Sequence, residues 1–226
     1  MHARTDQSWT AAPALPKARE GVVDVWLADL TAVPDELGAL LNVEERTRAE
    51  RLLNERHRLL WVRSRAVLRA LLARYLRLDP AVLELSLGEH GKPMLDSPGV
   101  APVQFNLSHS GEIALYAVSA VRAVGIDVQV ARRVIDELGV AAGVLGNAEA
   151  ERLATLDPET RTREFLRAWV AHEAAVKCRG AGLGRPSGAS PVAGLWTAEL
   201  DVGPSAAAAV AVEEGPCELR LWEWGG

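Results

Sequence analysis

Residues 113–130 read IALYAVSAVRAVGIDVQV and contain two strand-like runs on either side of the short segment 120–122. The first run, 113–118, is almost wholly apolar. In the second run, 124–130, apolar residues alternate with Gly125, Asp127 and Gln129. Short apolar runs and strict alternation both indicate β-strands. We therefore expect two strands here and a boundary between two parts of the chain at 120–122.

The order of the predicted elements is similar on both sides of this boundary. Before it, a first strand, a long helical segment and further strands are expected at 23–27, 34–78, 83–87 and 103–107. After it, a helical segment and three strands are expected at 147–177, 195–202, 207–212 and 218–224. Helices and strands segregated in this way favour an α+β fold over a doubly wound sheet. We predict two α+β halves, 21–120 and 121–226, after a flexible tail at 1–20.

The composition of the 226 residues excludes several classes of protein. With 49% apolar and 24% charged residues, the chain is neither collagen-like nor wholly disordered, and two cysteines make no disulfide framework. A net charge of −5 argues against a nucleic-acid-binding domain, which is usually basic. No apolar run is long enough to cross a bilayer. We expect a cytoplasmic protein with reduced thiols and no affinity for membranes or nucleic acid.

The strand at 124–130 carries the first candidate site. Residues two apart on a strand share a face, so Asp127 and Gln129 project together. A carboxylate and an amide oxygen on one face suit a hard cation such as Mg²⁺. The alternative is an ordinary amphipathic strand with a polar outer face, and this motif alone favours that alternative.

The helical segment WVAHEAAVK, 169–177, carries the second candidate site. Trp169, Glu173 and Lys177 lie four residues apart and form one stripe on the helix. Such a stripe suits a metal and a phosphate side by side, whereas the alternative is a plain surface ion pair. The chain has only three lysines, Lys17, Lys92 and Lys177, among 25 basic residues, which favours a function for Lys177.

Two further motifs offer groups that bind phosphate. The run FNLSHS, 105–110, ends a predicted strand with hydroxyls and an imidazole, and HGKP, 90–93, places Lys92 in a turn. A hydrogen-bonded turn explains FNLSHS equally well, whereas in HGKP turn chemistry explains Gly91 and Pro93 but leaves Lys92 free. A Ser-His-Asp hydrolase is excluded because no nucleophile elbow surrounds Ser108 and His109. Eight arginines between 46 and 69 stand among glutamates, which alone indicates a solvated, ion-paired helix.

The order and spacing of these motifs are more specific than any one of them. GKP, FNLSHS, GIDVQ and WVAHEAAVK resemble, between about 41 and 183, the Sfp-type 4'-phosphopantetheinyl transferases. The resemblance implies two α+β halves related by a pseudo-twofold axis, with the active site between them. It also implies transfer of the 4'-phosphopantetheine arm of coenzyme A to a serine of an apo acyl or peptidyl carrier protein. The other product is 3',5'-ADP, and the expected state is a monomer.

The resemblance also implies roles for individual residues. Asp127, Gln129 and Glu173 would hold Mg²⁺, which Mn²⁺ can replace, and Glu173 would take the proton of the carrier serine. Lys177 would neutralise the pyrophosphate. The residues expected to bind the coenzyme A nucleotide and its phosphates are Arg48, Arg58, Lys92, Ser108 and His109. On this view the arginine-rich helix is solvated on one side and faces phosphate on the other.

Two positions depart from the pattern of the family. Gln129 stands where the family usually has glutamate, and His172 stands where it usually has lysine. Each change removes one charge from the site, the first an anion and the second a cation. A catalytically weakened homologue that binds coenzyme A or a carrier protein is therefore the alternative function. An unrelated α+β interaction module ranks last, because chance would have to supply four motifs in order.

Overall fold

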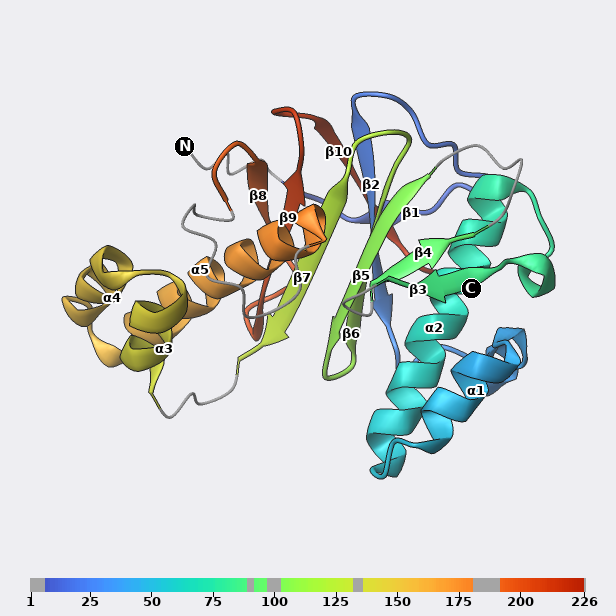
Figure 1. Ribbon diagram of the computed structural model, residues 1–226, viewed down its shortest axis with the longest axis horizontal. Coiled ribbons are helices and arrows are strands. Elements are labelled where there is room, and N and C mark those ends of the chain that lie inside the picture. The colour runs from blue at the N-terminus through green and yellow to red at the C-terminus, as the bar shows by residue number, and fades with distance from the viewer. Residues whose placement is uncertain (1–6, 89–91, 97–102, 132–135, 181–191, 226) are drawn as a thin grey trace.

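The structure is a computed structural model that describes residues 7–88, 92–96, 103–131, 136–180 and 192–225 (Figure 1). A mixed sheet of five strands has the order β1-β10-β2-β6-β5. Its strands are β1 (Thr10–Ala11), β10 (Glu218–Glu223), β2 (Val22–Asp29), β6 (Ile113–Ser119) and β5 (Gln104–Ser110). β10 runs parallel to both of its neighbours, whereas β2, β6 and β5 pair antiparallel.

A second, antiparallel sheet has the order β7-β9-β8. It consists of β7 (Val124–Val130), β9 (Ala206–Val212) and β8 (Trp196–Leu200). A short hairpin, β3 (Leu85–Leu87) with β4 (Pro93–Leu95), stands apart from both sheets. The mixed α+β class predicted from the sequence is confirmed, as are the strands expected at 113–118 and 124–130.

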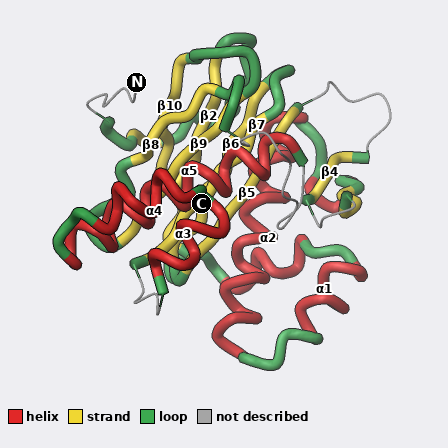
Figure 2. The backbone as a smooth tube through the Cα atoms, turned by 60° about the vertical axis from the view of Figure 1, so that its left-hand side comes forward, coloured by secondary structure: helices red, strands yellow, loops and turns green. Residues whose placement is uncertain are grey.

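Two long helices flank the sheets, and shorter ones lie at the ends of the molecule (Figure 2). The long helices are α2 (Glu55–Leu76) and α5 (Pro158–Arg179). The shorter ones are α1 (Val43–Glu50), α3 (Glu137–Val144), α4 (Asn147–Ala154) and the 3₁₀ turns η1 (Asp35–Leu40) and η2 (Pro80–Val82). Within the described residues, no helix is long and apolar enough to cross a membrane.

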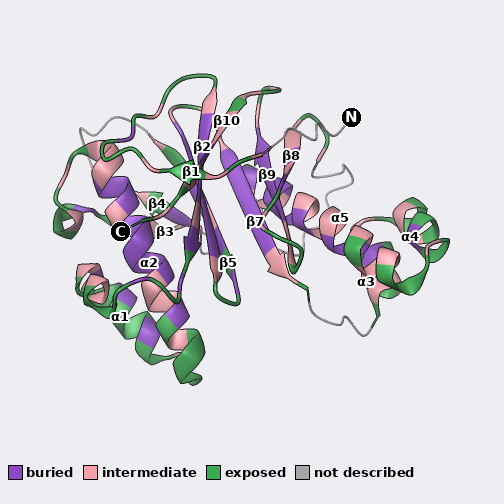
Figure 3. Ribbon diagram, turned by 180° about the vertical axis from the view of Figure 1, so that it is seen from behind, coloured by how far each residue is buried: buried purple, intermediate pink, exposed green. Residues whose placement is uncertain are grey.

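Alternate residues of the strands divide between separate cores. Trp26 and Tyr116 face α2 on one side of the large sheet, whereas Val25 and Leu115 face the other side. That second side packs against Ile126 of β7 and its neighbours, so one core lies between the two sheets. The opposite side of the small sheet packs on α5. Most buried residues therefore lie on β2, β6, β7 and β9 and on the inner faces of α2 and α5 (Figure 3).

The two sheets meet along β5 and β7, where side chains take the place of a backbone ladder. Asn106, Ser108 and Ser110, alternate residues of β5, accept hydrogen bonds from β7. Their donors are the N–H groups of Ile126, Val128 and Val130, at 2.9, 3.3 and 3.1 Å. We call these three pairs the β5–β7 seam. These hydrogen bonds fix the register of β7 against β5 and therefore the position of Asp127 beside β5.

The helical segments expected at 34–78 and 147–177 are each divided. The side chain of Asn42 caps α1 in a capping box with Glu45, and Asn54 caps α2, so two helices begin where one was expected. Asp157 caps α5 in the same way and separates it from α4. Helix α3 was not expected; its glycines at 139 and 143 weaken the helical pattern.

The two ends of the described chain are tied to the sheets. Residues 1–20 were expected to be a flexible tail, but Thr10–Ala11 pairs with β10 and the Trp9 indole donates to the carbonyl of Asp201. Residues 1–6 lie outside the described part. The last strand, β10, belongs to the sheet of the first half, between β1 and β2. The structure therefore interleaves the ends of the segments 21–120 and 121–226.

Candidate active site

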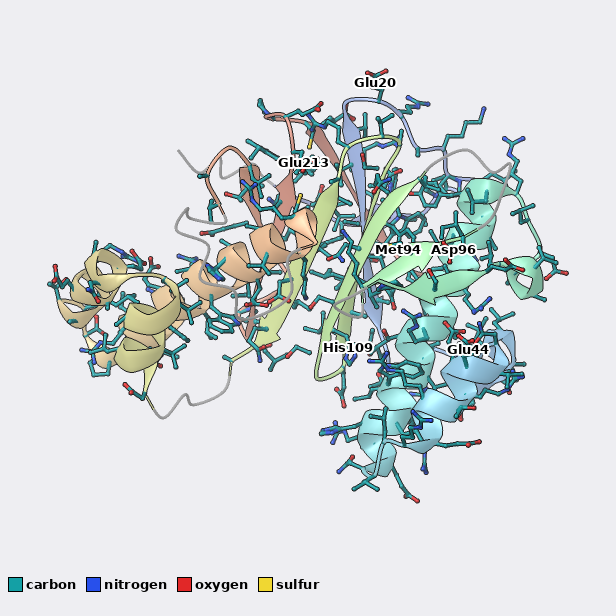
Figure 4. All side chains as sticks on the ribbon, in the orientation of Figure 1. Glu20, Glu44, Met94, Asp96, His109 and Glu213 are labelled. Carbon is teal, nitrogen blue, oxygen red and sulfur yellow. The ribbon has the colours of Figure 1, made fainter. Side chains whose placement is uncertain are left out.

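A cavity of about 390 Å³ opens where β5, α2 and α5 come together. Both halves of the chain line it. From the first half come Glu44, Glu45, Arg48, Trp61, Ser64, Arg65, Leu85, Lys92, Pro93, Asn106, Leu107, Ser108 and His109. From the second half come Glu173, Val176 and Lys177, in the C-terminal part of α5, and Gly180, which follows the helix. Figure 4 labels Glu44 on α1 and His109 on β5, two of these residues.

Three polar side chains meet at one end of the cavity. The Lys177 ammonium lies 2.5 Å from Oδ1 of Asp127 and also donates to the hydroxyl of Ser108 at 3.1 Å. That hydroxyl donates in turn to the same carboxylate oxygen at 2.8 Å. Asp127 is only 6% exposed, so this charge depends on its partners. Residues of three separated motifs therefore form one hydrogen-bonded group.

Gly125 permits the close contact on which this group depends. A Cβ at this position would lie 2.0 Å from the carbonyl oxygen of Ala174 and 2.3 Å from the nitrogen of Cys178. The backbone of α5 thus rests directly on β7 at Gly125. Two residues further along β7, Asp127 projects on the same face, towards α5. The glycine and the aspartate of the motif act together, the first by admitting the helix and the second by binding its lysine.

Glu173 lies one turn before Lys177 on α5 and is 6% exposed. Burial raises the pKa of its carboxyl group, the neighbouring charge of Asp127 raises it further, and Lys177 lowers it. The carboxylate of Asp127 therefore acts electrostatically on Glu173 where β7 packs against α5. No cluster of three His, Cys, Asp or Glu side chains is found in the described residues, so a metal here would rest on two carboxylates and other oxygens.

Gln129 occupies the next position on the same face of β7. Its amide nitrogen donates to the Ser110 hydroxyl and to the carbonyl of Val130, both at 3.3 Å. The side chain is therefore anchored to the β5–β7 seam. Because the nitrogen makes both contacts, the amide oxygen is the atom it offers to a cation. His172, the other unusual residue, is half-buried on α5, and burial lowers the pKa of its imidazole.

The expected nucleotide-binding residues are not all in one place. Arg48, Lys92, Ser108 and His109 line the cavity. Arg58 does not; it lies in the first turn of α2 and faces Glu55 at 3.8 Å. Lys92 is committed to the backbone, as it donates to the carbonyls of Lys177 and Val124. The residues His90 and Gly91 of the same motif lie outside the described residues.

A buried ion-paired group on the opposite wall was not identified from the sequence. Glu45 of α1 accepts from Arg65 at 3.0 Å and from Arg69 at 2.6 Å, both on α2. Arg65 and Trp61 line the cavity, and the Arg65 guanidinium lies 5.7 Å from the centre of the Trp61 ring. The signal was the spacing of Asn42 and Glu45, which marks a helix start and turns the glutamate inward. The many arginines of this segment favoured a solvated, ion-paired helix instead, so a buried glutamate was not expected.

The chain is similar in sequence to several known proteins. The chain is 34% identical over 151 residues to the 4'-phosphopantetheinyl transferase HetI of Nostoc sp., a match covering 66% of this chain and 64% of HetI. It is 31% identical to the phosphopantetheinyl transferase of Thraustochytrium sp., over 69% of this chain and 57% of that protein. It is 37% identical to the 4'-phosphopantetheinyl transferase AcpT of Salmonella typhimurium, over 50% of this chain and 56% of AcpT. Each match thus spans less than two thirds of the relative.

Two family models match consecutive parts of the chain. The model described as "4'-phosphopantetheinyl transferase, N-terminal" matches residues 33–121, and that of the 4'-phosphopantetheinyl transferase superfamily matches residues 123–220. Their junction falls at the boundary expected from the sequence. Both describe one family, and the chain belongs to the 4'-phosphopantetheinyl transferase superfamily.

Proposed function

We propose that this protein transfers 4'-phosphopantetheine from coenzyme A to a serine of an apo acyl or peptidyl carrier protein. The observation that carries the proposal is the group of Asp127, Glu173, Lys177 and Ser108 at one end of the cavity. The ammonium can neutralise charge on a pyrophosphate, and the two carboxylates can hold a divalent cation that does the same. The family and the names of the relatives support the same reaction.

The reaction balances with the groups at hand. The oxygen of the carrier serine forms a bond to the phosphorus that bears pantetheine. The bond from that phosphorus to the bridging oxygen breaks, and 3',5'-ADP leaves. Glu173 takes the serine proton, a task helped by its raised pKa. Lys177 stabilises charge on the phosphates, and Ser108 and Asp127 keep its ammonium in place.

The carboxylates also fit a divalent cation. Mg²⁺ prefers oxygen ligands, and Asp127, Glu173 and the amide oxygen of Gln129 are such ligands on adjoining faces of β7 and α5. The close packing of β7 on α5 at Gly125, which places Asp127 against the turn that carries Glu173 and Lys177, supports this donor set. The chemistry that Mg²⁺, or Mn²⁺ in its place, supplies there is neutralisation of the pyrophosphate charge. Gln129 in place of a carboxylate lowers the expected affinity for the cation.

For the nucleotide end of coenzyme A we assign Arg48 and His109, which line the cavity. Arg48 supplies a positive charge, whereas burial lowers the pKa of the His109 imidazole, which offers hydrogen bonds instead. Ser108 stands between the two ends. Arg58 is not among the residues that line the cavity and lies 3.8 Å from Glu55, so it is the weakest of these assignments. The proposed carriers are those of polyketide, nonribosomal peptide or fatty-acid synthesis. The chain would act as a monomer in the cytosol, where the free thiols of Cys178 and Cys217 stay reduced.

Mass spectrometry of a carrier tests the reaction directly. Incubation with coenzyme A, Mg²⁺ and apo carriers of all three classes should add the mass of phosphopantetheine to at least one of them. Asp127→Asn and Glu173→Gln should each lower the initial rate about 100-fold or more. Glu159→Gln, the same change in the exposed first turn of α5, is the matched control and should leave the rate unchanged.

The weakened homologue stays the second candidate, because Gln129 is anchored to Ser110 and Val130. It predicts that calorimetry detects coenzyme A binding while no carrier gains mass. Gln129→Glu together with His172→Lys would then restore transfer. Failure to bind coenzyme A at all would contradict both candidates.

A further inference from the structure

Lys92 joins three elements that the sequence holds far apart. It precedes β4, and its ammonium donates to the carbonyl of Lys177 in the last turn of α5 at 3.0 Å. The same ammonium lies 3.4 Å from the carbonyl of Val124, the first residue of β7. A lysine from the first half of the chain therefore contacts both backbone elements of the second half that carry the active-site carboxylates.

The end of α5 benefits from such a cation. The last carbonyls of a helix lack partners within the helix and carry partial negative charge, which a nearby ammonium offsets. The turn ends at Gly180 in the left-handed conformation, and the Gly180 N–H also donates to the Lys177 carbonyl, at 3.3 Å. The hydrogen bond from Lys92 to this carbonyl is thus shorter than the one from Gly180.

The contacts of Lys92 fix the backbone of a residue whose side chain is part of the site. Lys177 is held through its carbonyl by Lys92 and through its ammonium by Asp127 and Ser108. The junction that Lys92 spans is the one where Gly125 brings β7 against α5. A shift of this last turn would move Lys177 away from Asp127.

The surroundings of Lys92 agree with a structural task. Burial lowers the pKa of its ammonium, whereas Cys178 and Glu213 raise it. Glu213 follows β9 and is labelled in Figure 4. Cys178, next to Lys177, is buried and donates to the carbonyl of Ala123. The lysine is therefore surrounded by the groups that end α5 and begin β7.

We propose that Lys92 is a positioning residue that clips the last turn of α5 to β7 before any ligand binds, and that its main role is not to bind coenzyme A phosphates. Its effect on transfer rests on the proposed function, whereas its effect on the α5 turn does not. The two can therefore be measured separately.

The thiol of Cys178 reports on the α5 turn in the ligand-free protein. In a Cys217→Ser background, Lys92→Met should speed the reaction of Cys178 with a disulfide reagent about tenfold. Loss of one hydrogen bond from a charged group should make opening of the turn more favourable by about that factor. The sign is diagnostic. The charge of Lys92 lowers the Cys178 pKa, so losing that charge alone would raise the pKa and slow the reaction. Only an opened turn speeds it.

Two variants control this measurement. Arg48→Met removes a cation that lines the same cavity from α1, and it should leave the Cys178 rate unchanged. Lys92→Arg keeps a cationic donor and should restore most of the protection. Amide hydrogen exchange at 177–180 should follow the thiol in every variant, which separates opening of the turn from global unfolding.

Activity gives the second readout. Lys92→Met should lower kcat about tenfold while the dissociation constant of coenzyme A, measured by calorimetry, changes less than about twofold. A Cys178 rate that is unchanged or slower in Lys92→Met, or a coenzyme A affinity that falls with kcat unchanged, would overturn the proposal. If the wild-type protein transfers nothing, the thiol and exchange results still decide the role of Lys92.

Discussion

Gly125 is the residue on which contact between β7 and α5 depends most directly. A methyl group there would lie 2.0 Å from a backbone oxygen, and backbone cannot give way as a flexible side chain can. We expect Gly125→Ala to lower the free energy of unfolding by about 3 kcal/mol, the range of overpacked cores. Urea unfolding measures this. Gly143→Ala in α3, where a Cβ meets nothing within 4 Å, is the control and should be neutral or slightly stabilising.

An unchanged unfolding midpoint for Gly125→Ala would contradict this packing. The substitution should also reduce transfer more than it reduces stability, because the displaced helix carries Glu173 and Lys177 away from Asp127. A rate that recovers fully at low temperature, where the variant is folded, would show that the contact matters only for stability.

Cys178 shows how the same packing changes the chemistry of a side chain. Burial, and then the charge of Glu213, raises the pKa of its thiol to about 11. At pH 8 the reactive thiolate is then about 100-fold scarcer than for a thiol of ordinary pKa. In the Cys217→Ser background we expect native protein to react at least that much more slowly than protein unfolded in guanidinium chloride. The native rate should rise with pH until about pH 11. A plateau near pH 9 would contradict the shift.

Residue types and their order could predict most of the site, since Asp127, Glu173, Lys177 and Ser108 do lie together. Periodicity could not place Lys92 or Arg58. Whether an ammonium points at a ligand or at a backbone carbonyl depends on where distant elements end, and no local pattern of residues contains that information.

The β5–β7 seam is the feature of the elements that joins the halves. Each of its side-chain acceptors pairs with one N–H of β7, and Asn106 is buried. Asn106→Ala leaves the N–H of Ile126 without its acceptor, which should cost about 1–3 kcal/mol. Hydrogen exchange should show faster exchange at Ile126 than at residues paired with β9. Gln104→Ala, at the exposed start of the same strand, is the control.

Unchanged protection of the Ile126 amide in Asn106→Ala would contradict the seam. The sequence predicts both strands but not their relation, because FNLSHS offers the same residues to a turn, a ligand or a neighbouring strand. In the structure, the polar side chains of Asn106, Ser108 and Ser110 accept hydrogen bonds from the neighbouring strand β7. The predicted helix boundaries were wrong for a simpler reason. The N-cap residues Asn42, Asn54 and Asp157 lie inside stretches whose apolar spacing continues across them.

At the scale of the whole molecule, two similar halves were predictable and their interleaving was not. The boundary at 120–122 matches the junction of the two family models. Yet β10, close to the C-terminus, completes the sheet that begins with β2. Parallel pairing between strands so far apart in sequence leaves no local signal, because both strands alternate equally well in any sheet.

Because of this pairing, removing β10 should unfold the first half as well as the second. Asp24 of β2 is 1% exposed and depends on β10 for two of its partners, Arg220 at 2.7 Å and the Trp222 indole at 3.0 Å. Tyr75 is its third. A buried carboxylate deprived of its cation costs about 3–5 kcal/mol, a large share of the stability of a domain this size.

A chain ending at Gly215 should therefore lack cooperative thermal unfolding by circular dichroism. A chain ending at Trp224 is the matched control, since it keeps β10 and the hydrogen bond from the Trp224 N–H to the carbonyl of Leu27. Adding the peptide 216–226 should restore folding if the strand alone is missing. If the shortened chain unfolded cooperatively near the wild-type temperature, the first half would be an independent unit. In that case the fold of the first half would not depend on β10.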